Sequence, residues 1–224
     1  MSILLVTRTN EWCLAATEFL RTRIDGEVTV VTGERDDTLP EEVIRWSGDY
    51  LISFLSLWVL PEAVLRRATK GAVNFHPGPP EYPGIGCYNF ALYDEASSYG
   101  VTCHYMEPRV DSGKIIRVSR FPLCPADDVA QVKARSMTHL LALFHEITDL
   151  IAAGKELPAT AEQWTRKPYT RRELNALCEI TPDMDAQEIR RRVRATYFPG
   201  YPGPYTELGG FRFALEAPRG VDHR

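Results

Sequence analysis

The sequence lacks the cysteine pattern of a disulfide framework or a structural zinc site. Its five cysteines are scattered and form no Cys-x-x-Cys pair: Cys13, Cys87, Cys103, Cys124 and Cys178. Free thiols of this kind are usual in a reducing compartment, so we expect a cytoplasmic protein. No group of histidine, cysteine and carboxylate residues has the spacing of metal ligands, and we expect no metal cofactor.

Long apolar runs and an excess of positive charge are also missing. No apolar stretch approaches the ~18 residues of a membrane span. The opening residues Met1–Val6 have no basic lead and are typical of a first strand rather than of a signal peptide. A net charge of −4 gives no field for non-specific nucleic-acid binding. We therefore expect neither a membrane nor a nucleic acid as partner.

Hydrophobic patterning predicts strands that alternate with helices in the first third of the chain. Strands are expected at residues 3–7, 28–32, 51–54 and 72–76, and helices at 10–23, 40–46 and 61–68. This alternation is typical of an α/β fold with a doubly wound, mostly parallel sheet. Such sheets bind ligands beyond the carboxyl ends of their strands.

The rest of the chain predicts an extended sheet, one long helix and a small appendage. Residues 101–106 and 114–121 continue the sheet, and apolar residues at helical spacing predict a helix over 126–153 that Gly154 ends. We divide the chain into a catalytic domain, 1–153, and a C-terminal extension, 154–224. The extension is expected to hold short helices and a β-hairpin, 205–216, as a possible dimer contact.

The segment Val73–Gly84 carries the most informative pattern. Asn74 and His76 project to the same side of a strand that ends in a loop rich in proline and glycine. Asp111 follows the next predicted strand, in the turn Val110–Gly113. An amide, an imidazole and a carboxylate on neighbouring strand ends suit acyl transfer. His76 could act as general base or, when charged, as a hydrogen-bond donor to an oxyanion.

These motifs carry a family resemblance. Asn74–Pro77, then Gly100–Thr102, then Val110–Ile116 resemble the formyltransferases that use N10-formyltetrahydrofolate. The resemblance implies a Rossmann-like catalytic domain in which Asn74, His76 and Asp111 surround the reacting carbonyl. Asp111 would orient His76 and favour its charged form.

Within that family, the sequence is most similar to the nucleotide-linked amino-sugar N-formyltransferases. The similarity lies in the loop after His76, in Arg166–Tyr169 and in the segment Phe198–Pro204. It implies formyl transfer to a dTDP- or GDP-linked amino sugar for bacterial surface polysaccharide such as O-antigen, with dTDP preferred, by a homodimer. Two alternatives stay open: transfer to another small amine such as a purine-pathway ribonucleotide, and a catalytically silent nucleotide-sugar binder.

The resemblance also implies ligand contacts. Folate-contacting residues are expected to be Leu57, Trp58, Val59, Leu60, Met106, Val110 and Asp111, and nucleotide-sugar contacts Arg8, Thr9, Asn10, Tyr82 and Tyr201. Arg8 to Asn10 occupy a strand-to-helix turn, where the N–H groups at a helix start can bind a pyrophosphate.

Other residues have two readings each. For His104 we favour a structural role inside a strand, and for Cys87 a small buried hydrophobe. The run Arg190–Arg194 is either a phosphate grip or, as we favour, a solvated helix face. Trp58 is either a filler of the core or a wall of the pterin site.

Overall fold

A six-stranded sheet in the order β2-β1-β3-β4-β5-β6 forms the centre of the protein. The computed structural model describes residues 1–34 and 36–216. The strands are β1 (Ser2–Thr7), β2 (Glu27–Thr32), β3 (Gly48–Phe54), β4 (Ala68–His76), β5 (Ser98–Tyr105) and β6 (Ile115–Pro122). Strands β1 to β4 are parallel, whereas β5 and β6 run antiparallel to their neighbours. The predicted α/β class with a mostly parallel sheet is confirmed.

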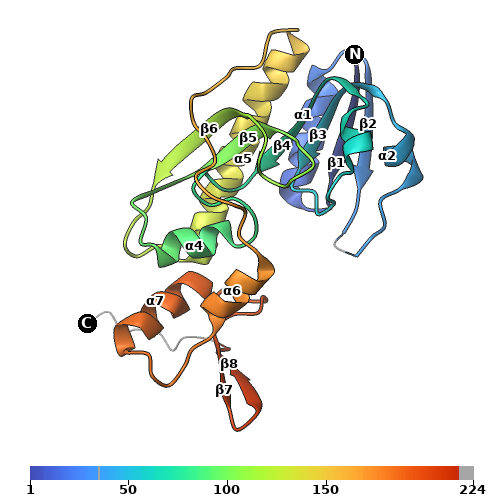
Figure 1. Cartoon of the computed structure of the whole chain (residues 1–224). Helices are drawn as coiled ribbons and strands as arrows, with labels where there is room; N and C mark the ends of the chain where they lie inside the picture. Colours follow the sequence, from blue (N-terminus) through green and yellow to red (C-terminus); the bar gives the residue numbers. More distant parts are fainter. Residues whose placement is uncertain (35, 217–224) are drawn as a thin grey trace.

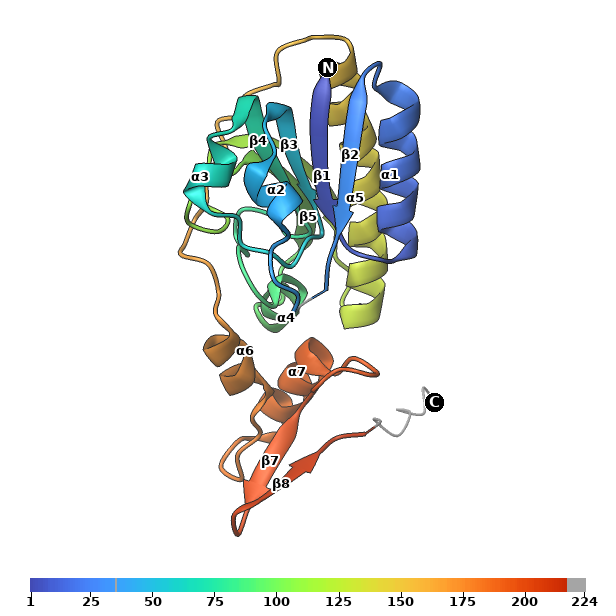
Figure 2. The same ribbon diagram turned by 90° about the vertical axis from the view of Figure 1, so that its right-hand side faces the viewer.

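Helices cover both faces of this sheet. Figures 1 and 2 show α1 (Glu11–Arg23) and α5 (Val129–Ala152) on one face, and α2 (Glu41–Arg45) and α3 (Glu62–Leu65) on the other. The apolar side chains of β1, β3 and β4 lie on both faces of the sheet, because helices cover each face. Phe54, Phe75 and Phe144 pack together between the sheet and α5.

Local capping fixes where the helices begin and end. The Asn10 side chain accepts a hydrogen bond from the N–H of Cys13 and so begins α1. Asp128 and Gln131 form a capping box at the start of α5. Gly154 has φ +64 beyond the end of that helix, a conformation that costs glycine little.

Strand β3 begins at Gly48 rather than at the predicted residue 51. Gly48, Asp49 and Tyr50 lack an apolar pattern, but their backbone still extends the sheet, with Gly48 opposite Ala68. The helix predicted at 61–68 is shorter, because the backbone enters β4 at Ala68. A pattern read from side chains does not detect pairing that the backbone alone provides.

The C-terminal part lies beyond the carboxyl ends of the parallel strands, toward which the arrowheads of β1 and β2 point in Figure 2. It contains α6 (Arg171–Cys178), α7 (Ala186–Thr196) and a hairpin of β7 (Tyr205–Leu208) and β8 (Phe211–Ala214). Helix α7 packs against α4 (Cys87–Tyr93). The division at residues 153 and 154 stays a prediction, and its last part, 217–224, lies outside the described residues.

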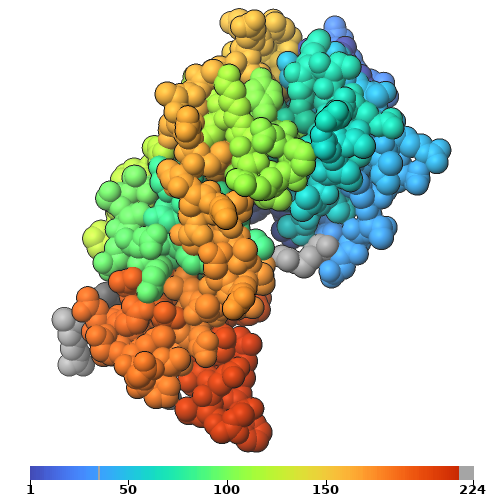
Figure 3. All heavy atoms as spheres, viewed as in Figure 1, coloured from blue at the N-terminus to red at the C-terminus, as the bar shows by residue number. Residues whose placement is uncertain are grey.

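A segment that we call the strap, residues 155–169, joins α5 to α6. It has no regular secondary structure and crosses the front of the molecule next to the β5–β6 region (Figures 1 and 3). Figure 3 shows a hollow between the strap and the teal lobe that carries α3. None of the helices in the described ranges is long and apolar enough to span a membrane.

Candidate active site

The three residues predicted to form the reacting centre converge where β4 ends. Asn74 and His76 are contributed by β4, and Asp111 by the turn between β5 and β6. In the antiparallel pair of β4 and β5, Asn74 lies opposite His104. The site therefore contains an amide, two imidazoles and one carboxylate.

His76 is held between two acceptors. Its Nδ1 is 3.3 Å from Asp111 Oδ2, and its Nε2 is 3.1 Å from the carbonyl oxygen of Tyr82. A carbonyl oxygen only accepts, so Nε2 carries a proton, and the carboxylate is best satisfied by a second proton on Nδ1. This arrangement suits the imidazolium form of a side chain that is only 7% exposed.

His104 lies on the other side of Asp111. Its Nδ1 donates to the carbonyl of Tyr105 (2.8 Å), and its Nε2 is 3.4 Å from Asp111 Oδ1 and 3.1 Å from Asn74 Nδ2. A neutral ring accepts from the Asn74 amide, whereas a charged ring donates to Asp111 and favours a half-turn of that amide. The charge of His104 therefore decides which end of the Asn74 amide faces the imidazole, and whether one or both of its N–H groups are left for another partner.

Asp111 is ionised in this environment. Burial alone would raise the pKa of this carboxyl, but the charge of His76 opposes it, as do the hydrogen bond and charge of His104 and the N–H of Gly84. The net result is a pKa well below the ordinary value for aspartate. Asp111 adopts φ +44, a left-handed conformation that is strained for a residue other than glycine.

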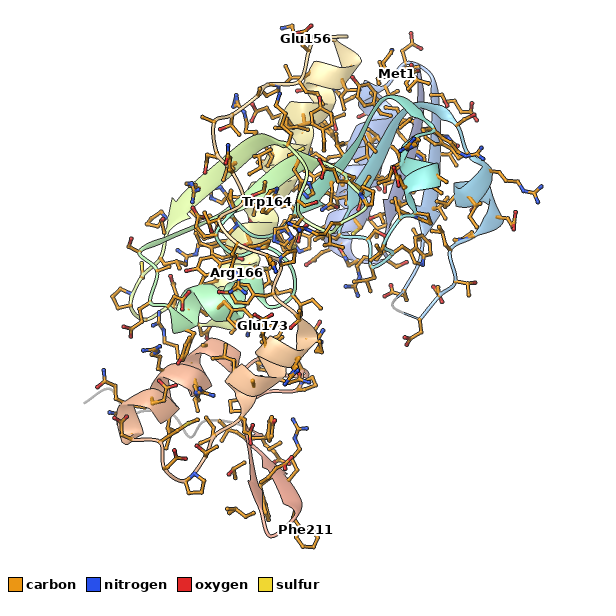
Figure 4. All side chains as sticks on the ribbon, viewed as in Figure 1. Met1, Glu156, Trp164, Arg166, Glu173 and Phe211 are labelled. Atoms are coloured by element: carbon orange, nitrogen blue, oxygen red, sulfur yellow. The ribbon has the colours of Figure 1, made fainter. Side chains whose placement is uncertain are left out.

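The structure brings a fifth residue to the site that the sequence did not indicate. Trp164, from the strap, lies with its ring 5.0 Å from that of His104 and 6.0 Å from that of His76, measured between centroids. Figure 4 places it where the strap meets the sheet. His104 is also part of the site by position, and its register opposite Asn74 was not visible in the sequence.

The predicted folate contacts differ in exposure. Trp58 is partly buried against the core, and its indole N–H donates to the carbonyl of Asp37 (2.9 Å). Leu60 is buried in the same hydrophobic cluster, Met106 packs against it, and Val110 is 44% exposed. Leu57 is partly buried and Val59 is exposed. Their roles as folate contacts stay predictions.

The predicted nucleotide-sugar contacts do not form one group. Arg8 pairs with Glu34 at 3.3 Å, which also accepts from the N–H of Thr9, and Asn10 is occupied as the helix cap. Tyr82 is buried between aromatic rings. Tyr201, 60% exposed, packs on Phe198 in the extension. Their roles as ligand contacts also stay predictions.

A groove of about 600 Å³ lies between the strap and the turn that follows Asp111. Its lining includes Arg109, Lys114 and Lys167, for which no ion pair is found among the described residues, and Glu162, which pairs with Arg120. The groove is therefore positively charged. Among the described residues, no group of three or more histidine, cysteine or carboxylate side chains is placed to hold a metal ion.

Fold and site together define a Rossmann-like α/β protein with an acid–base cluster at the ends of its strands. The sequence model of the family described as "Formyl transferase" matches residues 25–146, more than half of the chain. This chain belongs to the formyl transferase family.

Individual relatives agree with this assignment. A methionyl-tRNA formyltransferase of Parabacteroides distasonis is 28% identical over 190 residues, which are 81% of this chain and 58% of that protein. The chain thus spans little more than half the length of that curated relative.

Solved structures show the same fold. A sugar N-formyltransferase of a Shewanella species has a TM-score of 0.78 at 16% identity, with 99% of each chain covered. An N-formyltransferase of Helicobacter canadensis, solved with folinic acid and dTDP-3-aminofucose, has a TM-score of 0.75 at 18% identity, covering 94% of this chain and 85% of that one.

Proposed function

We propose that this protein moves a formyl group from N10-formyltetrahydrofolate to the amine of a nucleotide-linked amino sugar. The observation that carries the proposal is the convergence of Asn74, His76 and Asp111 at one strand end in a member of the formyl transferase family. The similar fold of the Shewanella sugar N-formyltransferase supports an amino sugar as acceptor. The Helicobacter enzyme, solved with folinic acid and dTDP-3-aminofucose, supports both a folate donor and a nucleotide-linked acceptor.

The chemistry follows from the groups present. The uncharged amine attacks the formyl carbon, a C–N bond forms, and the carbonyl oxygen becomes an oxyanion. The bond to N10 then breaks, N10 takes up a proton, and the new amide loses one. Removing one donor to such an oxyanion typically raises the barrier by about 3 kcal/mol. Asn74 supplies one donor. Both N–H groups of a charged His76 are occupied in this structure, by Tyr82 O and Asp111, so His76 supplies a second donor where the oxyanion takes the place of the Tyr82 carbonyl at Nε2.

The acceptor is anionic, because a nucleoside diphosphate carries it. We place its phosphates in the groove lined by Arg109, Lys114 and Lys167 as an alternative to the turn at Arg8. Glu34 competes for Arg8 at that turn, whereas the groove borders the residues next to Asp111.

Two single variants separate these placements. Lys167→Ala should raise the KM for the sugar nucleotide about tenfold, since a charge-assisted hydrogen bond contributes roughly 1.5 kcal/mol. Arg8→Ala should raise it by a similar factor only if the first turn holds the phosphates. The KM for the formyl donor is the internal control and should change in neither variant. An unchanged KM in Lys167→Ala would refute the groove placement.

The finer features of the proposal are a dTDP carrier, a role in surface polysaccharide synthesis, a cytoplasmic setting and a homodimer. The five cysteines are free, which fits a reducing compartment. The exposed apolar side chains of the hairpin support the homodimer. Transfer to a tRNA is a second candidate because of the curated relative, but the net charge of −4 provides little attraction for RNA.

The direct test is a product assay. The full chain is incubated with N10-formyltetrahydrofolate and, separately, with dTDP-linked 3-amino and 4-amino sugars, a purine-pathway amine and an initiator tRNA. Mass spectrometry of the products detects the formyl gain. We expect the gain on an amino sugar, and its loss in His76→Ala with sugar-nucleotide affinity retained. A formyl gain on the other amines alone would refute the acceptor, and none on any amine would refute the activity.

A further inference from the structure

The strap is fastened across the loop that follows His76. The N–H of Thr165 donates to Pro80 O (3.2 Å), the N–H of Tyr169 to Pro83 O (2.9 Å), and the N–H of Ile85 to Tyr169 O (3.0 Å). Gly84 has φ +84 at this contact, and a Cβ there would collide with the backbone of Tyr169. The strap and the loop therefore hold each other in one register.

Side chains reinforce this attachment. The guanidinium of Arg166 lies 3.1 Å from the ring centroid of Tyr169, which stacks on Phe90 at 3.6 Å. Arg166 also pairs with Glu173 at 2.9 Å, and Figure 4 shows these two residues together where the strap enters α6. Trp164 directly precedes the first anchored residue, Thr165, and lines the groove. Its backbone position is therefore fixed by the attachment of the strap.

Trp164 contacts both imidazoles at angles typical of favourable aromatic pairs. The ring planes are at 90° for His104 and 70° for His76. The indole N–H donates to Gly113 O at 2.8 Å, two residues after Asp111. Gly113 is buried, and a Cβ there would overlap the carbonyl of Tyr105. One side chain therefore touches both histidines and ties down the strained turn that carries their carboxylate.

We propose that Trp164 is a positioning residue of this site: it sets the ring orientation of His76 and His104, keeps water away from them and holds the turn of Asp111. This inference rests on the proposed function for its kinetic effects only. The described contacts make it the one strap side chain whose ring lies against both imidazoles.

The kinetic test compares two replacements. Trp164→Leu removes the aromatic contact and the N–H, and displacement of reacting groups by about 1 Å costs on the order of 10²-fold in rate. We expect a fall of about that size in kcat, with the KM for both substrates within about threefold. Trp164→Phe keeps a ring and should recover about a tenth or more of the wild-type kcat. Trp46→Leu, the same change at the opposite end of the sheet, is the matched control and should keep the wild-type kcat.

The second readout needs no activity. In the ligand-free protein, imidazole N–H signals of His76 and His104 are followed by nuclear magnetic resonance, with assignments from His76→Asn and His104→Asn. We expect faster proton exchange with water and shifted signals in Trp164→Leu, intermediate changes in Trp164→Phe, and none in Trp46→Leu.

These readouts separate the two proposals. If the wild type formylates no amine, the proposed function fails, and the imidazole signals still decide the role of Trp164. Wild-type kcat and wild-type imidazole signals in Trp164→Leu would overturn the inference. Should the Leu variant not fold, the Phe variant decides: unchanged imidazole signals together with unchanged kcat would overturn it.

Discussion

Asp111 is the residue on which the site depends, because one carboxylate serves two imidazoles and a backbone N–H. Its Oδ2 faces His76 and accepts from Gly84 at 2.7 Å, and its Oδ1 faces His104. The side chain is 4% exposed, so water cannot replace any of these partners. A buried charge of this kind persists only where its partners are all in place.

Asp111→Asn should therefore cost stability in a pH-dependent way. Removing one partner of a buried ion pair costs about 3 kcal/mol or more. Because the pKa of Asp111 is lowered on folding, its contribution is fully present above the ordinary aspartate value of about 4 and is lost as the pH falls below it. Urea unfolding of both proteins at pH 7 and near pH 2 measures this.

We expect the difference between wild type and Asp111→Asn to shrink toward acid pH. Asp49→Asn provides the comparison: the pKa of Asp49 is also lowered, chiefly by the N–H of Ser2, but its side chain is more exposed and lies at the far end of the sheet, so its stability difference should have the same pH dependence and be smaller. A pH-independent difference for Asp111→Asn would contradict the ion pair.

His104 should matter through Asn74. An oxyanion needs N–H donors of the amide. Both N–H groups of Asn74 are free when a charged His104 donates from Nε2 to the amide oxygen, and one is free when a neutral His104 accepts from the amide. His104→Ala should lower kcat by about 10²-fold, the effect typical of losing one oxyanion donor. His139→Ala is the control, because that ring bonds Ser119 on the outer part of the sheet. Equal kcat in the two variants would argue against an effect of His104 on catalysis through Asn74.

The central residues were predictable, and two of their neighbours were not. Asn74, His76 and Asp111 stand at strand ends next to a break in pattern, which the sequence displays directly. His104 was read as structural, since nothing in one sequence reveals which residue faces Asn74 across the sheet. Trp164 lies in a segment without periodicity, and its position depends on backbone hydrogen bonds to the loop at Pro80 and Pro83.

At the scale of elements, the basic run on α7 has a role that neither sequence reading described. Arg192 donates to the carbonyls of Ala176, Leu177 and Glu179 and so caps the end of α6. Arg194 bonds the carbonyl of Asp127, just before α5. The arginines of this run join three helices to one another. Charge density alone could not distinguish such backbone capping from a phosphate site.

Arg192→Ala should consequently destabilise the extension. Three carbonyls lose a charged donor, and each such hydrogen bond contributes on the order of 1.5 kcal/mol, partly replaced by water. We expect a loss of about 2 kcal/mol. Arg190→Ala, on the exposed side of the same helix, is the matched control and should be neutral. Thermal unfolding of both variants decides, and equal melting temperatures would refute the capping role.

The helices and strands themselves were largely predictable. The period of the apolar residues in α5 and the capping residues Asn10, Thr170 and Asp185 are local signals, and the structure places helix starts directly after them. The path of the strap was not predictable, because its attachment joins residues that are 84 to 86 positions apart, beyond the reach of local propensity.

At the scale of the whole molecule, the hairpin is the part that a single chain explains least. It projects away from the sheet, with Phe211 at its tip in Figure 4. Phe211 is 71% exposed, Phe213 55% and Leu208 51%. Large apolar side chains that gather on one projecting element mark a surface for association. An edge of two short strands also leaves backbone groups free to pair.

We therefore expect the hairpin to hold the proposed homodimer. A stable interface needs about 800 Å² from each partner, so Leu215 and Tyr201, which are also exposed, should contribute beside the strands. The double variant Phe211→Ser, Phe213→Ser should convert a dimer into a monomer, as measured by light scattering after gel filtration. Leu14→Ser replaces a similarly exposed apolar residue on α1 and should leave the mass unchanged.

A dimer that survives the double variant would move the interface elsewhere, and a wild-type protein that is monomeric at micromolar concentration would exclude a stable homodimer. Because the site residues from β4, the Asp111 turn and the strap all belong to one chain, the monomeric variant should keep the activity, and that separates assembly from catalysis.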